Sequence, residues 1–153
     1  MPINILGSSE PELVLYLPNP PLLPSEQLMG ASGSGLNIPE LIELNGNHWR
    51  KILTILAKIC APDGDWRQYR DHQLLKQKEA VCFGDSLLSQ PAQHLVAGKA
   101  SWERLGLETH DFVAVDDQQR AWKRDQVFLV PYLDYRQFPN ALVDKIKHCL
   151  NVT

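Results

Sequence analysis

A serine that follows a short apolar run is the first residue whose setting could support chemistry. The run ends in Phe83-Gly84-Asp85-Ser86-Leu87, so Ser86 falls in the turn after a predicted strand. A serine nucleophile needs a base that takes its proton and donors that stabilise the oxyanion. The rest of the chain contains no Asp-x-x-His pair, and Asp144 and His148 lie four residues apart. We therefore interpret residues 83–87 as a strand-to-turn junction.

The same string resembles the first motif of the GDSL serine hydrolases, which is also an apolar strand that runs into Gly-Asp-Ser-Leu. The resemblance covers five residues and implies acyl transfer with Ser86 as the nucleophile. A serine hydrolase is therefore kept as one alternative function.

Metal ligands and phosphate-binding loops are not evident in the sequence. The five histidines are scattered and form no H-x-x-x-H pair. The glycine-rich residues 30–35 neither follow a predicted strand directly nor open a helix, so they predict a flexible loop. We expect no metal ion and no cofactor.

The basic residues are distributed unevenly along a chain of 153 residues with a net charge of −3. Residues 1–49 contain no Lys or Arg and five carboxylates, whereas residues 50–153 contain all 15 basic residues. This balance excludes a whole-surface basic nucleic-acid binder and a polybasic membrane-surface protein. The length favours a single domain over residues 1–153.

The three cysteines are an odd number at wide spacings, each in an apolar run, which favours buried thiols over disulfides. No signal peptide is visible at the N-terminus, and no apolar stretch approaches the ~18 residues that span a bilayer. We expect a cytoplasmic protein that does not enter a membrane.

Apolar periodicity predicts strands that alternate with helices. A strand at residues 12–17 ends at Pro18-Asn19-Pro20-Pro21, and among residues 1–39 it is the only strand that we expect. An alternating pattern predicts an α/β domain with a mainly parallel sheet, whose ligands bind outside the carboxyl ends of the strands. The further predicted strands are 80–83, 93–97, 112–115 and 127–130. One predicted helix begins at residue 38, and a second is capped by Asn47 and ends before Pro62. The other predicted helices are 65–78, 99–105 and 140–150.

Four segments, in this order, resemble the mismatch-specific and thymine branch of the uracil-DNA glycosylase superfamily. The strand 12–17 runs into Leu17-Pro18-Asn19-Pro20, where that branch has a strand and Gly-Ile-Asn-Pro-Gly. Gly46-Asn47-His48-Trp49 matches an Asn-x-Phe-Trp helix start, and residues 94–100 match an apolar strand that ends in Gly-Lys. Residues 127–137 match a strand that enters a Pro-containing loop before the last helix.

This resemblance implies a three-layer α/β domain and a hydrolase of N-glycosidic bonds in DNA, which is a DNA-repair activity. Such chemistry needs a positioned water, a pocket for the extruded base and contacts to the strand. Asn19 matches the family residue that positions the water, and the loop from Pro20 to Leu23 would line the base pocket. The other residues expected at the crevice are Asn47, His48, Trp49, Tyr132, Asp134, Arg136 and Gln137, of which the last two would contact the strand.

A second interpretation assigns the same residues to structure alone. Asn19 would then be a turn residue, Trp49 and Trp102 core aromatics, and residues 132–137 a surface loop. A relative that has lost catalysis could still bind a nucleotide, a nucleic acid or a protein, because a fold does not determine a function. The basic and aromatic residues at 66–70 and 120–124 could face a nucleic acid or form a solvated surface.

Overall fold

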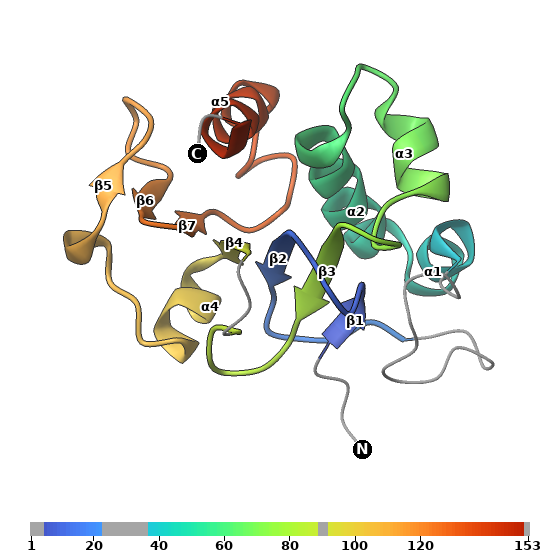
Figure 1. The fold of residues 1–153 in the computed structure, drawn as a ribbon, viewed down its shortest axis with the longest axis horizontal. Coiled ribbons are helices and arrows are strands. Elements are labelled where there is room, and N and C mark those ends of the chain that lie inside the picture. Colours follow the sequence, from blue (N-terminus) through green and yellow to red (C-terminus); the bar gives the residue numbers. More distant parts are fainter. Residues whose placement is uncertain (1–4, 23–36, 89–91, 152–153) are drawn as a thin grey trace.

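A computed structural model describes residues 5–22, 37–88 and 92–151 (Figure 1). Within these residues the chain folds into strands and helices that alternate along most of its length. The glycine-rich residues 30–35 and Leu23 lie outside the described residues. The elements are β1 (Ile5–Gly7), β2 (Leu13–Tyr16), α1 (Ile38–Asn45), α2 (Asn47–Cys60), α3 (Trp66–His72), β3 (Glu79–Cys82), β4 (Gln93–Ala97), α4 (Lys99–Arg104), the 3-10 turn η2 (Thr109–Asp111), β5 (Val113–Ala114), β6 (Trp122–Arg124), β7 (Val127–Val130) and α5 (Asn140–Asn151).

All the described strands pair into one sheet in the order β1-β3-β2-β4-β7-β6-β5. The four central strands are parallel: β2 pairs with β3 on one side and with β4 on the other, and β4 pairs with β7. Both edges are antiparallel, with β1 against β3, and β6 between β7 and β5. The predicted parallel sheet is therefore present at the centre and is extended by antiparallel strands on both sides.

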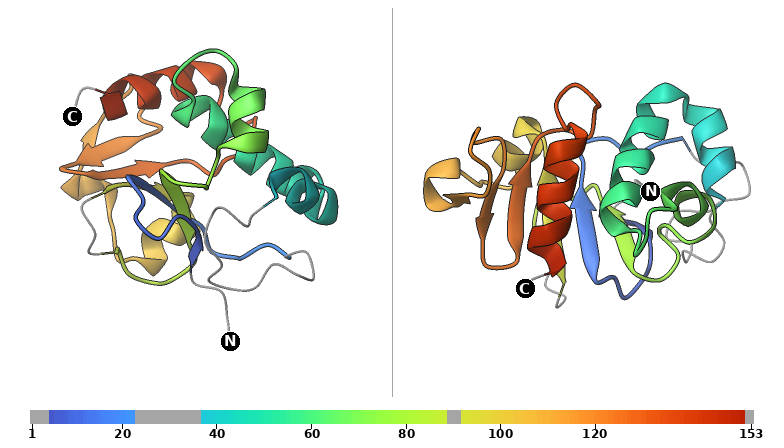
Figure 2. Two further views of the ribbon diagram at one scale, coloured as in Figure 1. Left: turned by 45° about the vertical axis from the view of Figure 1, so that its right-hand side comes forward. Right: turned by 90° about the horizontal axis from the view of Figure 1, so that it is seen from above.

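Helices cover both faces of the sheet, which makes three layers (Figures 1 and 2). Helices α1, α2, α3 and α5 pack on one face, and the larger hydrophobic cluster lies beneath them. Helix α4 and the segments that follow it cover the other face, where a smaller cluster contains Tyr16, Val96 and Leu129. The prediction of an α/β domain is confirmed.

Local sequence explains where the helices begin. Asn37 caps α1 because its side-chain Oδ1 accepts the Glu40 N–H at 3.0 Å, and Asp65 caps α3 in the same way. The predicted cap of α2 is wrong, because Gly46 occupies the cap position and Asn47 is the first helical residue. Helix α2 therefore begins without a side-chain acceptor for its first amide groups.

The second predicted helix is too long. It was expected to reach residue 78, but α3 ends at His72. Leu75 has a φ of 64°, which no helix permits, and its N–H donates to Glu79 Oε1 at 2.9 Å. The buried carboxylate of Glu79 needs hydrogen-bond donors, and this need thus overrides the helical propensity of residues 73–78.

Two short strands are additional to those predicted from the sequence. Strand β1 lies in the segment where only residues 12–17 were expected to form a strand, so that expectation is wrong. Strand β6 has the sequence Trp-Lys-Arg and exposes part of its surface. Each has three residues and is held by antiparallel pairing with a buried neighbour, so neither shows a strong pattern of its own.

We predict that Gly7→Ala destabilises the fold. Gly7 has a φ of +114°, and an added Cβ would lie 2.8 Å from the backbone oxygen of Glu79. Residues held in such conformations cost about 1–3 kcal/mol, so the free energy of unfolding in urea should fall by about that amount. Gly64→Ala is the matched control, because a Cβ there meets nothing within 4 Å. An equal loss in both variants would contradict the account.

Candidate functional site at the switch point of the sheet

The carboxyl ends of the four parallel strands meet at one edge of the sheet, called here the switch-point edge. The chain runs from β2 outward to β3 and then returns across β2 to β4 and β7, so the strand order reverses between β2 and β4. Ligands of open α/β sheets bind outside the carboxyl ends at such a reversal. The segments that reach this edge are residues 17–22, 83–88, 98–99 and 131–137.

Side chains from α4 connect these strand ends. The Arg104 guanidinium donates to the Pro18 carbonyl after β2 and to the Phe83 carbonyl after β3, each at 3.0 Å. The Trp102 indole N–H lies 2.9 Å from the Val96 oxygen and 3.2 Å from the Val130 oxygen. Helix α4 thereby fixes the ends of all four parallel strands relative to one another.

The first turn of α2 lies across the same edge. His48 Nε2 shares a 2.7 Å hydrogen bond with the Tyr132 hydroxyl after β7, and the two rings are stacked. Trp49 packs on Phe83 after β3, with ring centroids 6.3 Å apart. Strands β2 and β4 lie between β3 and β7. The first turn of α2 therefore spans the point between β2 and β4 at which the strand order reverses. Its amide groups carry the positive end of the helix dipole.

Tyr132 also contacts the end of β4. Gly98 has a φ of +85°, and its N–H donates to the Val130 oxygen at 2.8 Å. A Cβ at this position would lie 3.2 Å from Tyr132 Cδ1, so a glycine allows the ring to approach the backbone. Burial raises the pKa of the Tyr132 hydroxyl, and the nearby Asp134 carboxylate raises it further.

Asn19 lies exposed between two anchored positions. Pro18 is held by Arg104, and Leu22 is held by Asn45, whose side-chain amide accepts the Leu22 N–H and donates to the Leu22 carbonyl at 2.8 Å each. Asn19 follows β2 and Tyr132 follows β7, and these two strands lie on either side of β4. Neighbouring strands are about 4.7–4.9 Å apart, so the ends of β2 and β7 are about 10 Å apart. Pro20 is exposed as well.

The remaining predicted site residues lie beside Tyr132. Asp134 accepts the Arg136 N–H at 3.0 Å and pairs with Lys51 at 3.4 Å. These two contacts lower the pKa of the Asp134 carboxyl, and the Arg136 backbone contributes most. The side chains of Arg136 and Gln137 are exposed, as is Asn47, whereas Trp49 is buried in the core.

Ser86 is exposed in the loop after β3. No hydrogen bond between described residues joins it to a histidine. His48 and His94 have the hydroxyls of Tyr132 and Tyr16 as their partners. The serine hydrolase interpretation thus gains no geometric support among the described residues.

A buried polar network that sequence reasoning missed connects β2, β4 and the loop after β3. The Tyr16 hydroxyl accepts the Leu88 N–H at 3.0 Å and lies 2.7 Å from His94 Nδ1, to which it can donate its own proton. Burial raises the pKa of Tyr16 to about 12 and lowers that of His94. Tyr16 and His94 stand on the same face of neighbouring strands, where Tyr16 pairs with Val96 and His94 with Val14, and the sequence alone does not reveal this register.

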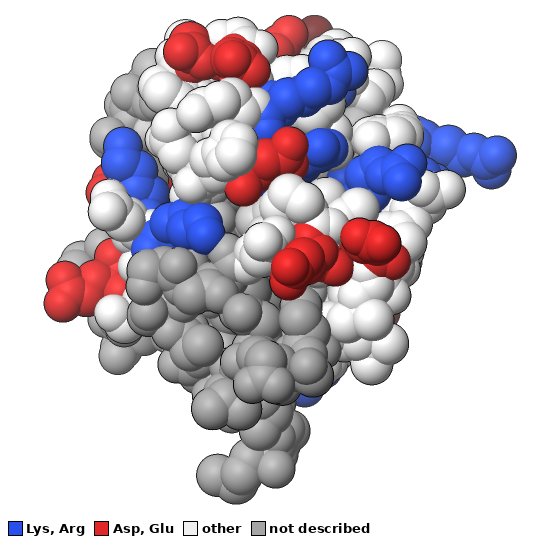
Figure 3. All heavy atoms as spheres, turned by 90° about the vertical axis from the view of Figure 1, so that its right-hand side faces the viewer, with Lys and Arg blue, Asp and Glu red and all other residues white. Residues whose placement is uncertain are grey.

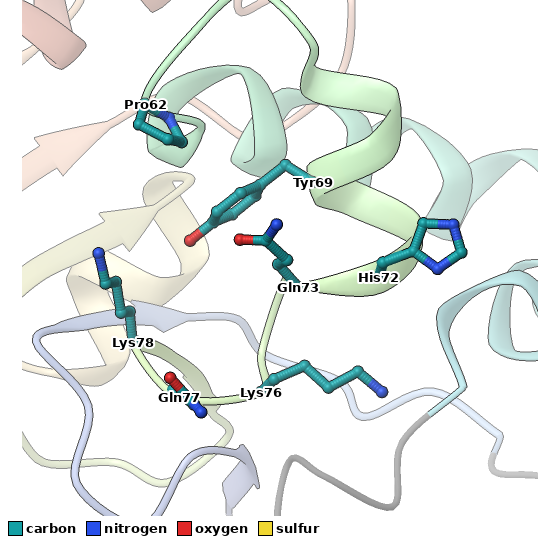
Figure 4. Close-up of a pocket in the computed structure, with 7 residues that line it drawn as sticks. All are labelled: Pro62, Tyr69, His72, Gln73, Lys76, Gln77 and Lys78. Atoms are coloured by element: carbon teal, nitrogen blue, oxygen red, sulfur yellow. The ribbon is translucent and has the colours of Figure 1, made fainter.

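A hollow of about 560 Å³ lies at the opposite edge, where β3 begins (Figure 4). In Figure 4 the side chains of Tyr69, Gln73 and Lys78 point toward one another, whereas His72 points away. Tyr69 donates to the buried carboxylate of Glu79, whose pKa is raised by burial. The two most buried polar groups near this hollow thus satisfy each other, and we do not place the candidate site here.

The described residues contain one cluster of metal-ligand type, Glu108, His110 and Asp111, whose ligand atoms lie within 4.8 Å of one another. All three side chains are exposed, and the His110 ring lies 3.4 Å from each carboxylate. The expected absence of a metal ion stays a prediction. Among the described residues the three cysteines are unpaired, and Cys82 is buried.

Charge is mixed on the face formed by α1 and α3. Lys and Arg side chains alternate there with Asp and Glu (Figure 3). This face therefore presents no extended field of one sign. No helix in the described ranges is both long and apolar enough to cross a membrane.

Fold and site together define an α/β domain whose four parallel strands end at one topological switch point. A family-wide sequence profile matches residues 4–151, and the chain belongs to that family, a family of unknown function (DUF6942). No curated protein and no solved structure matches the chain.

We predict that His94 couples the stability of the fold to pH. Its pKa is lowered in the folded chain, so below the ordinary value of about 6.5 the unfolded chain binds more protons. The stability that neutral His94 contributes to the fold is therefore fully present above about pH 6.5 and is lost as pH falls through the pKa of His94 in the folded chain. The difference in unfolding free energy between wild type and His94→Gln, measured in urea, should shrink from pH 7 to pH 5. A constant difference would contradict this assignment.

Proposed function

We propose that the chain is a uracil-DNA glycosylase-like hydrolase that binds an extruded base at the switch-point edge and cleaves its N-glycosidic bond. The observation that supports this most is the position of α2, whose first turn links the loops after β3 and β7 across the ends of β2 and β4. Asn19, which matches the glycosylase motif, and His48 and Tyr132, which lie in segments that resemble the family, are all on segments that reach this edge.

The proposed chemistry assigns one task to each group. The side-chain amide of Asn19 holds a water near the sugar carbon, because an amide can accept and donate hydrogen bonds at once. The stacked pair of His48 and Tyr132 forms a wall against which a flat base can lie. The amide groups that begin α2 have no side-chain cap, so their positive potential favours the negative charge that develops on the departing base.

A second candidate is a relative that binds a nucleotide or nucleic acid without hydrolysis. The glycines that flank Asn in the glycosylase motif are replaced by Leu17 and Pro21, and both of these residues are buried. A backbone without glycine approaches a base less closely. Near Tyr132, Lys51 is paired with Asp134 and therefore offers less free positive charge to a phosphate.

We predict that Asn19→Ala greatly slows base release. Wild-type protein incubated with oligonucleotides that contain uracil or mismatched thymine should produce alkali-sensitive sites. Loss of a group that positions the reacting water should reduce the rate roughly 100-fold or more. The rate is measured by strand cleavage after alkali treatment in single turnover.

Gln118→Ala is the matched control, because it removes an exposed amide in the turn before β6. It should leave the rate unchanged. If wild type releases no base but binds the oligonucleotide, the non-catalytic candidate replaces the hydrolase. Equal activity in wild type and Asn19→Ala would remove Asn19 from the proposed mechanism.

A further inference from the structure

A surface of basic and aromatic side chains extends along α2 from the loop after β7. It is called here the cation–aromatic strip. Helices α2 and α3 and the loop after β7 all contribute to it. Its members are Lys51, Lys58, Trp66, Arg67, Arg70 and Tyr135.

Contacts between cations and rings join the members of the strip. The Lys51 and Lys58 ammonium groups lie 5.7 and 6.0 Å from the Tyr135 ring, so this ring sits between two residues one heptad apart on α2. Lys58 also lies 5.1 Å from the Trp66 ring. Two arginines of α3 complete the series, with Arg67 at 4.9 Å and Arg70 at 5.6 Å from Trp66.

The strip retains positive charge that is available to a ligand. Lys51 pairs with Asp134 and Arg70 pairs with Asp71. None of the ion pairs between described residues involves Lys58 or Arg67. Two of the four cations thus keep their charge free of a carboxylate contact, which contrasts with the net charge of −3 for the whole chain.

The surface around Lys58 is hollowed on two sides. One hollow of about 390 Å³ is lined by Lys58, Trp66 and Lys147, together with the carboxylates of Asp63 and Asp144. A second of about 340 Å³ is lined by Lys58, Tyr135 and Phe138. Helices α2 and α5 lie side by side here (Figure 2, right). Tyr135 is 47% exposed, so its ring is open to stacking.

We propose that the cation–aromatic strip binds the backbone and bases of a single-stranded nucleic acid. Aromatic rings that stack bases, interspersed with cations that contact phosphates, are the groups by which proteins bind single strands without sequence preference. The strip begins at Lys51, whose partner Asp134 lies two residues after Tyr132 of the crevice. This inference rests on the proposed function, because it supplies the path by which the strand leaves the crevice.

The test is titration of the intact chain with a fluorescein-labelled 12-nucleotide oligothymidylate, followed by anisotropy at 50 to 200 mM NaCl. For single strands, log K falls with log salt by about 0.7 per phosphate contact. Lys58→Gln with Arg67→Gln should therefore reduce the slope by about 1.4. Arg124→Gln is the matched control, because Arg124 also lies over a ring, Phe112 at 4.5 Å, but on β6. It should leave the slope unchanged.

Variants of Tyr135 distinguish the contribution of base stacking to binding from that of charge. Tyr135→Ala should weaken binding roughly fivefold or more, whereas Tyr135→Phe should bind as wild type does. Oligouridylate should bind similarly, and a duplex of equal length should bind more weakly, because its bases cannot reach the rings. Absence of binding at 50 mM NaCl, an equal slope change in Arg124→Gln, or equal affinity for the duplex would overturn the proposal.

The outcome separates this proposal from the proposed hydrolysis. Oligothymidylate contains neither uracil nor a mismatch, so its binding does not depend on base release. Strand binding without base release supports the strip and contradicts the hydrolase. Suppose that wild type releases the base and that neither the rate of release nor the affinity for the strand changes in the Lys58→Gln, Arg67→Gln variant. That result supports the hydrolase and overturns the strip.

Discussion

Parallel pairing of β2 with β3 on one side and β4 on the other is the constraint on which the rest of the structure depends. Because these strands and β7 are parallel, the loops after all four meet at one edge, and the chain leaves β2 in one direction and returns to β4 in the other. The antiparallel strands at the two borders extend this arrangement without changing it. The candidate crevice is therefore a consequence of strand order.

Polar contacts then set the shape of that edge. Arg104 binds two main-chain carbonyls, through an exposed hydrogen bond to Pro18 and a part-buried one to Phe83. The ion pair of Lys51 and Asp134 lies where solvent screens it, so it contributes little to stability. Arg104 thus joins the loops after β2 and β3, and the His48–Tyr132 contact joins α2 to the loop after β7.

The sequence predicted most of the central architecture, because buried strands and amphipathic helices have strong apolar periods. Strands β4 and β7 and helix α2 occur where periodicity placed them. The sequence did not predict β1, which depends on a partner strand distant in the chain. It also missed β6, a short strand without an apolar period, and the early end of α3, which depends on the burial of Glu79. It placed Asn19 and Tyr132 after strands, but the bond from His48 to Tyr132 spans 84 residues and has no local signal.

The central claim is that a base binds at the switch-point edge, and an NMR titration tests it most directly. The amide resonances of the isotope-labelled chain are followed while a uracil-containing oligonucleotide is added. We expect the largest shifts at residues 17–20, 47–49, 98–99 and 131–133, which lie on that edge. Shifts confined to residues 69–78, around the hollow at the opposite edge, would contradict the claim.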